Sequence, residues 1–237
     1  MQTHARPHRG HPHTHPTLND QVFSRTVGAH LISGNRVTLL RDSRENYPAW
    51  LDAIASARSY VHFENYMVHD DASGARFADA FIAKAREGVS VRVIYDWIGC
   101  VGTGRKFWDR LRAAGVDARA YNPPRLDEPL GWITRDHRKC LVVDGQVAFV
   151  TGLCVGQMWE GTPEKGRGPW RDTGVEIRGP AVVEVAEAFA DSWRAVGGVL
   201  PEGELPPIEP PAAEGSVRLR VVAARPGGAR LYRLDPL

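Results

Sequence analysis

The order of apolar runs along the chain constrains the fold more than any other feature. From Arg36 onward, short β-branched or aromatic runs alternate with segments whose apolar residues recur at helical spacing. The expected strands span residues 37–40, 60–68, 90–97, 116–121, 136–143, 146–150 and 171–177. A sheet whose strands are joined through helices is covered on its faces. The sequence therefore predicts an α/β fold with a mixed, largely buried sheet.

Composition divides the chain into four parts. Residues 1–24 hold five of the nine histidines among prolines, and we expect a disordered arm there. Residues 25–198 form the domain, and residues 199–215, with five prolines, form a linker. Residues 216–237 repeat the strand, polar turn and helix start that open the domain. We interpret them as the start of an incomplete second repeat.

The chemically distinctive stretch is residues 134–156, which contain His137, Lys139 and the dipeptide Asp144-Gly145. Asp-Gly between two β-branched runs is a strong signal for a two-residue hairpin turn. In the strand expected before that turn, residues two apart share a face, so His137 and Lys139 should point into one site. An imidazole beside a fixed ammonium suits a phosphodiester, because the imidazole can attack phosphorus while the cation holds the non-bridging oxygens.

His137, Lys139 and Asp144 have the spacing H-x-K-x4-D, and Thr151-Gly152 follows after six further residues. This pattern resembles the signature of the phospholipase D superfamily, and it is most similar to bacterial cardiolipin synthases. The resemblance spans residues 37–196. It implies the α-β-α sandwich of a phospholipase D half-domain. It also implies an enzyme that transfers phosphatidyl groups between anionic phospholipids, with phosphatidylglycerol as donor and acceptor, through a phosphohistidine intermediate on His137.

The resemblance further implies which residues hold the phosphate and orient the nucleophile. Lys139, Thr151 and Gly152 would bind the phosphate, and Asp172 would orient His137. Thr151 stands where the family has its first Gly, a departure within the motif itself.

Three other candidate site residues each allow more than one interpretation. Cys154 stands where the family has an Asn that supports the site, so we expect a weaker phosphate site. Asp144 belongs to the catalytic motif, yet we expect it to act as the turn residue of the hairpin rather than as a proton carrier. Glu64 lies in a strand whose sequence predicts burial. A carboxyl group there either supports the site or makes a structural hydrogen bond.

The family normally pairs two such motifs, and here no other His is followed two places later by Lys. The chain therefore holds half a site, and a second H-x-K must come from a missing second half or from a second copy in a homodimer. Two alternatives stay open. The chain is either a catalytically impaired, truncated half of such an enzyme, or a homodimeric single-motif phosphodiesterase or nuclease.

Composition limits the partners. The net charge of +2 argues against nucleic acid and leaves an anionic phospholipid as the expected substrate. The chemistry calls for no cofactor and no metal, because Lys139 supplies the cation. Apolar runs are too short to span a membrane, and the first residues do not read as a signal peptide. We expect a cytoplasmic chain, or one peripheral on the cytoplasmic membrane, with Trp108, Trp132, Trp159 and Trp170 as lipid-facing candidates.

Overall fold

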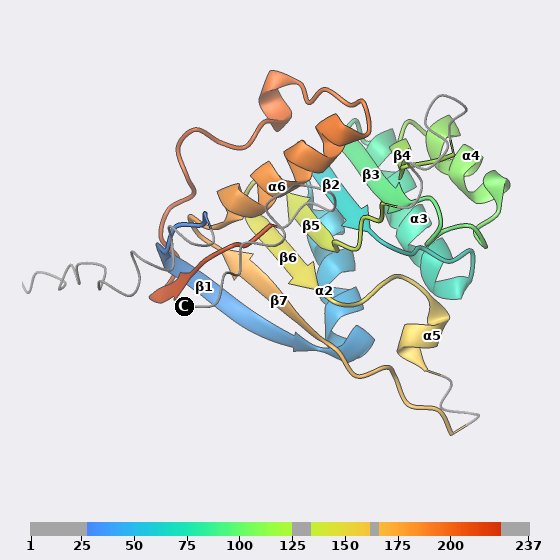
Figure 1. The fold of residues 1–237 in the computed structure, drawn as a ribbon, viewed down its shortest axis with the longest axis horizontal. Helices are drawn as coiled ribbons and strands as arrows, with labels where there is room; N and C mark the ends of the chain where they lie inside the picture. Colours follow the sequence, from blue (N-terminus) through green and yellow to red (C-terminus); the bar gives the residue numbers. More distant parts are fainter. Residues whose placement is uncertain (1–27, 125–133, 162–165, 224–237) are drawn as a thin grey trace, which may run out of the picture.

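The computed structural model describes residues 28–124, 134–161 and 166–223; the predicted arm at residues 1–24 lies outside them. Figure 1 shows the order of the elements. Their bounds are β1 Ile32–Arg41, α2 Asp42–Ser56, β2 Tyr60–Asn65, α3 Ala72–Arg86, β3 Ser90–Asp96, α4 Arg105–Ala113, β4 Asp117–Tyr121, β5 Cys140–Val143, β6 Val147–Thr151, α5 Gln157–Glu160, β7 Thr173–Arg178, α6 Val182–Ala195, the 3-10 helix η3 Glu202–Glu204 and β8 Val217–Leu219.

The strands form one sheet of eight, in the order β4-β3-β2-β5-β6-β7-β1-β8. Strands β2, β3 and β4 are parallel neighbours, and the remaining pairs are antiparallel. The parallel pairs are joined through helices and the β5–β6 pair through the tight turn at Asp144-Gly145. The prediction of a mixed sheet in an α/β fold is therefore confirmed.

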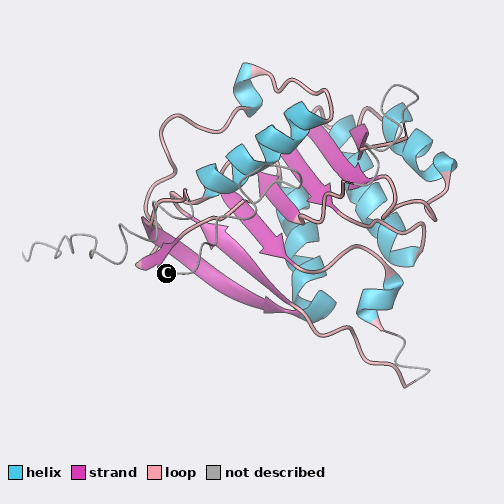
Figure 2. Cartoon of the chain, viewed as in Figure 1, coloured by secondary structure: helices cyan, strands magenta, loops and turns pink. Residues whose placement is uncertain are grey.

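Helices cover both faces of this sheet (Figure 2). On one face, α2, α3 and α4 bury an aromatic core that includes Tyr47, Trp50, Phe77 and Phe107. On the other face, α6 packs Phe189 and its neighbouring apolar residues against the sheet. The result is a three-layer α-β-α sandwich, as the family resemblance implied.

Side chains that bond to the backbone set the start of α3 and the late start of β5. Helix α3 is capped by Asp71, whose carboxylate accepts hydrogen bonds from the backbone N–H groups of Ser73 and Gly74. Strand β5 begins at Cys140 and not at residue 136. Before it, the N–H of Asp136 bonds to the Asp96 carboxylate and not to a neighbouring strand.

The proline-rich segment after α6 is anchored to the domain. Glu204 is 7% exposed, and its carboxylate bonds to His62 of β2 and Arg92 of β3. Further on, β8 pairs with β1 at the edge of the sheet. The interpretation of residues 216–237 as the start of a second repeat remains a prediction.

Candidate active site

Five elements bring their ends to one edge of the sheet. Strands β2 and β3 end there, β5 begins there, β6 ends there, and β7 begins there, as their pairing registers require. The backbone N–H of Thr151 bonds to the carbonyl of Lys139 at this edge. Loops and strand ends at one edge of an α/β sheet are a common place for a site. The H-x-K segment therefore lies where catalytic side chains can converge.

His137 and Lys139 face each other. The Lys139 Nζ lies 3.2 Å from His137 Nδ1 and 2.8 Å from the His137 carbonyl oxygen. Both side chains pack on Tyr66, with 4.6 Å between the His137 and Tyr66 ring centroids and 5.3 Å from the Lys139 Nζ to the Tyr66 ring. His137 is exposed and Lys139 is 4% exposed. The predicted pair is thus assembled, with the imidazole outward and the ammonium behind it.

The surroundings favour a neutral imidazole. Burial and the Lys139 charge lower the pKa of His137, while Asp96 and Asp136 act in the opposite direction. Burial lowers the pKa of Lys139, and Cys154, Asp136, Asp172 and Asp96 oppose that shift. Because the pKa of His137 lies below the usual value for histidine, the imidazole is uncharged near pH 7. A neutral imidazole is the form that can act as a nucleophile.

Asp172 contacts the glycine turn after β6. A Cβ placed on Gly152 would lie 2.5 Å from Asp172 Oδ2, so only Gly allows this approach. The Asp172 carboxylate accepts a hydrogen bond from the N–H of Thr173, and the Thr151 Oγ1 accepts one from the N–H of Leu153. Gly152 thus has a structural reason to be Gly. The phosphate-binding roles of Thr151 and Gly152, and the orienting role of Asp172, remain predictions.

Cys154 lies beside Lys139. It is 2% exposed, and its backbone carbonyl accepts a hydrogen bond of 2.6 Å from the Tyr47 hydroxyl. Burial raises the pKa of the Cys154 thiol, although Lys139 and a hydrogen bond from Met67 lower it. A neutral thiol is a weak hydrogen-bond donor, so this position offers little to a phosphate oxygen.

Asp144 lies at the far end of β5 from His137. It occupies the hairpin turn with φ 53°, and Gly145 follows with φ 66°. Its carboxylate accepts hydrogen bonds of 2.8 Å from the backbone N–H groups of Arg58, Ser59 and Tyr60. The structure does not bring Asp144 to His137, and these bonds tie the hairpin to the start of β2.

Glu64 is buried on the sheet face that α6 covers. Its carboxyl group lies 3.1 Å from Arg138 and accepts a hydrogen bond of 2.6 Å from the Ser192 hydroxyl. The structural hydrogen bond expected for Glu64 is therefore present.

Three polar residues at this edge were not anticipated: Asn65, Tyr66 and Asp96. Asn65 and Asp96 are the last residues of the parallel strands β2 and β3, and Tyr66 follows β2. The sequence signal was available, since the carboxyl ends of parallel neighbours meet at one edge. Asp96 is 1% exposed and accepts N–H groups from Gly99 and Asp136.

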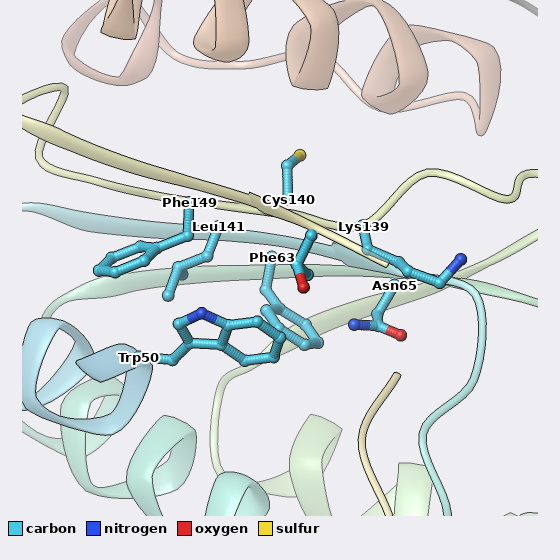
Figure 3. A pocket seen from close by; sticks show the side chains of 8 residues that line it. Trp50, Phe63, Asn65, Lys139, Cys140, Leu141 and Phe149 are labelled. Carbon is cyan, nitrogen blue, oxygen red and sulfur yellow. The ribbon is translucent and has the colours of Figure 1, made fainter. Parts of the chain in front are cut away.

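The side chains beside Lys139 leave only a narrow gap, with no room for a water molecule (Figure 3). Asn65 and Lys139 lie at one end of it, and the side chains of Trp50 and Phe63 line the rest together with other apolar residues. Cys140 points to the opposite face, toward α6. This gap is lined mostly by apolar side chains, whereas His137 is exposed on the outer side.

The tryptophan predictions are partly wrong. Trp108 and Trp159 are each 5% exposed and belong to the core, because Trp108 stacks on Tyr95 and Trp159 packs near α2. Trp132 lies outside the described residues. Trp170 is 58% exposed and remains a candidate for lipid contact. Within the described residues, no helix has the length and apolarity to cross a membrane, and no cluster of His, Cys, Asp or Glu could hold a metal ion.

Comparison with known proteins agrees with this geometry. Residues 50–155 match the family described as "Cardiolipin synthase, PLD-like domain". The cardiolipin synthase of Geobacillus thermodenitrificans is 34% identical over 213 residues, which cover 88% of this chain and 42% of that protein. Cardiolipin synthase A of Pseudomonas aeruginosa is 35% identical over 200 residues, which cover 84% and 40%. The chain thus spans about two fifths of the length of these curated relatives.

Solved structures share the fold at low sequence identity. Phosphatidylserine synthase from Haemophilus influenzae superposes with a TM-score of 0.53 at 13% identity, over 72% of this chain and 40% of that one. NucT from Helicobacter pylori gives a TM-score of 0.51 at 12% identity, over 70% of this chain and 99% of that one. Together with the sequence matches, this fold identifies the chain as a member of the phospholipase D superfamily that carries a domain of the cardiolipin synthase type.

Proposed function

We propose that the chain provides one half of a phosphatidyltransferase site. His137 attacks the phosphorus of an anionic phospholipid such as phosphatidylglycerol, which forms a phosphatidyl-histidine and releases glycerol. The hydroxyl of a second phosphatidylglycerol then attacks the same phosphorus and displaces His137, giving cardiolipin. The observation that carries this proposal is the outward imidazole of His137 held against the buried ammonium of Lys139.

The contact between Lys139 and His137 in the free chain determines which ring nitrogen of His137 carries the proton before the first step. A charged Lys has only donors, so Nδ1 of a neutral His137 accepts and its proton sits on Nε2. A substrate phosphate competes for the same ammonium. When Lys139 turns to the phosphate oxygens, Nδ1 is released and can carry the proton, which leaves Nε2 free to attack. Phosphate binding and nucleophile activation are then one event.

A second imidazole must protonate the leaving glycerol oxygen, since His137 is occupied by phosphorus in that step. We propose that it comes from a second H-x-K, carried either by a further half of the enzyme or by a second copy of this chain. The relatives' greater length agrees with the first source.

The substrate also requires contact with a lipid surface, and we place the chain peripherally on the cytoplasmic membrane. Trp170 and Met158, 58% and 41% exposed, lie in the segment between β6 and β7, which begins and ends at the site edge. The nearby side chain of Arg171 is 73% exposed. Apolar and cationic side chains together suit an anionic lipid interface.

An impaired half is the second candidate, and the buried Cys154 favours it. A thiol replaces an amide beside Lys139, so the phosphate loses a donor. Such a chain would fold and bind anionic lipid but would turn over slowly even with a second H-x-K present.

The test is a transfer assay on phosphatidylglycerol vesicles, with and without a chain that supplies a second H-x-K. We expect cardiolipin and glycerol only in the mixture, and a loss of at least about 10³-fold for His137→Ala. His30→Ala, at an exposed histidine away from the site, is the matched control. Turnover that survives His137→Ala would refute the proposal, and no turnover in any mixture would favour the impaired half.

A further inference from the structure

The two residues next to His137 in the sequence hold its backbone in place through hydrogen bonds and ion pairs. Asp136 and Arg138 lie on either side of His137, outside any strand. Asp136 is 2% exposed, and its N–H donates to Asp96 Oδ2 at 3.0 Å. The N–H of Arg138 donates to Asp136 Oδ1 at 3.2 Å. Side chains therefore hold this stretch of backbone where strand pairing does not.

The Arg138 guanidinium joins this segment to two other elements. It lies 3.1 Å from Glu64 Oε1 on β2 and 3.4 Å from Asp136 Oδ1, and it donates to the Ala188 carbonyl of α6 at 3.3 Å. The Arg138 side chain is 21% exposed, while those of Glu64 and Asp136 are 1% and 3% exposed. One guanidinium thus faces two buried carboxyl groups.

Two buried carboxylates beside one guanidinium leave an excess negative charge, which a proton removes at lower cost than burial of both charges. Glu64 is the group in which the proton is expected, because burial and the neighbouring Asp136 raise its pKa well above the usual value. Arg138 and the Ser192 hydroxyl, which donates at 2.6 Å, act in the opposite direction. The thiol of Cys140 lies 3.4 Å from the other Glu64 oxygen. Among the described residues, Tyr121 of β4 and Asp96 of β3 are further titratable neighbours.

We propose that Glu64, Asp136 and Arg138 form a positioning device for His137, in which Glu64 holds a proton and Asp136 is the ionised partner of Arg138. The proposal takes from the proposed function only that His137 is the reacting residue. The two acids then have different roles: Asp136 supplies charge next to His137, whereas Glu64 supplies shape and hydrogen bonds.

This difference gives a test with paired substitutions. Glu64→Gln imitates a protonated Glu64 and should preserve the network. Asp136→Asn removes the charge that opposes the lowered pKa of His137 and leaves Arg138 without an ionised partner. The controls are Glu187→Gln on the exposed side of α6 and Asp109→Asn on α4, whose side chain is 54% exposed.

The primary measurement is the pKa of His137 by NMR titration of the full chain labelled in histidine, with the signal assigned from His137→Gln. We expect Asp136→Asn to lower the pKa of His137 by on the order of half a pH unit or more, and Glu64→Gln and both controls to leave it in place. An equal shift in the two variants would overturn the proposal, because Glu64 would then be ionised. No shift in Asp136→Asn would also overturn it.

A second measurement does not depend on the folding of Asp136→Asn. At neutral pH, the infrared spectrum of Glu64→Gln should lack a C=O band of a protonated carboxylic acid that the wild type shows. Loss of a carboxylate band instead would refute the assignment of the proton to Glu64. Neither readout needs turnover, so a failure here is distinguishable from a failure of the phosphatidyltransferase proposal.

Discussion

At the scale of single residues, the candidate site holds a buried cation against an imidazole. Lys139 is almost fully buried, and its ammonium bonds to both the ring and the backbone of His137. Burial of an unpaired ammonium is costly, so these bonds stabilise the buried charge.

The first prediction concerns the proton of His137. Because the Lys139 ammonium can only donate, neutral His137 should carry its proton on Nε2 in the free chain. Long-range ¹H–¹⁵N correlation above the pKa of His137 measures this directly. Lys139→Met is the matched variant, and it should remove the preference and raise the pKa of His137 by removing a nearby positive charge. A proton on Nδ1 in the wild type would contradict the geometry.

The second prediction concerns Cys154. Replacing the buried thiol by an amide in Cys154→Asn should add a donor beside Lys139 and tighten the binding of inorganic phosphate. The gain corresponds to a hydrogen bond to a charged group, about 1–3 kcal/mol, or roughly 5- to 150-fold in affinity. Calorimetric titration measures it, and Cys154→Ala is the control without a donor. A folded Cys154→Asn chain with unchanged affinity would show that phosphate does not reach this position.

At the scale of elements, the β5–β6 hairpin presents the site at one end and is fastened at the other. Asp144 performs the fastening through three backbone N–H groups at residues 58–60. The third prediction is that Asp144→Ala lowers the free energy of unfolding by about 2–3 kcal/mol, because three backbone N–H donors lose their charged acceptor and Ala disfavours a positive φ.

Denaturant unfolding measures that loss of stability. Asp144→Asn should lose less stability, because Asn tolerates the backbone conformation of the turn. The pKa of His137 should be the same in both variants, since Asp144 lies at the opposite end of β5. A changed His137 pKa in folded Asp144→Ala would connect Asp144 to the site after all.

The fourth prediction concerns Glu204, which fastens the proline-rich segment. Burial raises the pKa of Glu204, but hydrogen bonds from His62 and Arg92 outweigh it and lower the pKa to about 2. A depressed carboxyl pKa stabilises the folded state above the unfolded pKa, and this contribution is lost as the pH falls through the folded pKa. Glu204→Gln should therefore cost about 2–4 kcal/mol at pH 7, and the difference from wild type should shrink between pH 4.5 and pH 2.

Chemical denaturation across that pH range is the measurement, with the exposed Glu209→Gln as control. A difference that does not depend on pH would mean that Glu204 stabilises by packing and not by its charge.

The sequence predicted these elements well where local chemistry decides, and less well where distant contacts do. The Asp-Gly turn follows from residues that adopt a positive φ, and it is present. The burial of Trp108 and Trp159 depends on partners elsewhere in the chain. In the candidate site, the His137–Lys139 pair was predictable from spacing. The position of Asp96 at the end of a parallel strand was also a usable signal, but its bond to Asp136 was not predictable, because the two residues lie 40 apart in the sequence.

At the scale of the whole molecule, the proposed mechanism needs two H-x-K motifs, and this chain carries one. The fifth prediction is that the isolated chain is monomeric and shows little or no turnover of phosphatidylglycerol. Sedimentation at micromolar concentration, combined with the vesicle assay, measures both properties. Addition of a chain with the second H-x-K should restore transfer. A monomer that turns over phosphatidylglycerol unaided would show that this domain supplies its own general acid.

The central claim is that His137 becomes covalently attached to phosphorus, and trapping that intermediate tests it most directly. The chain, mixed with one that supplies the second H-x-K, would be quenched during reaction with phosphatidylglycerol labelled in its phosphate and digested for mass spectrometry. The account predicts an acid-labile phosphatidyl group on the peptide that contains His137, absent from His137→Ala and present in His30→Ala. Transfer to cardiolipin without label on His137, or label that persists in His137→Ala, would contradict it.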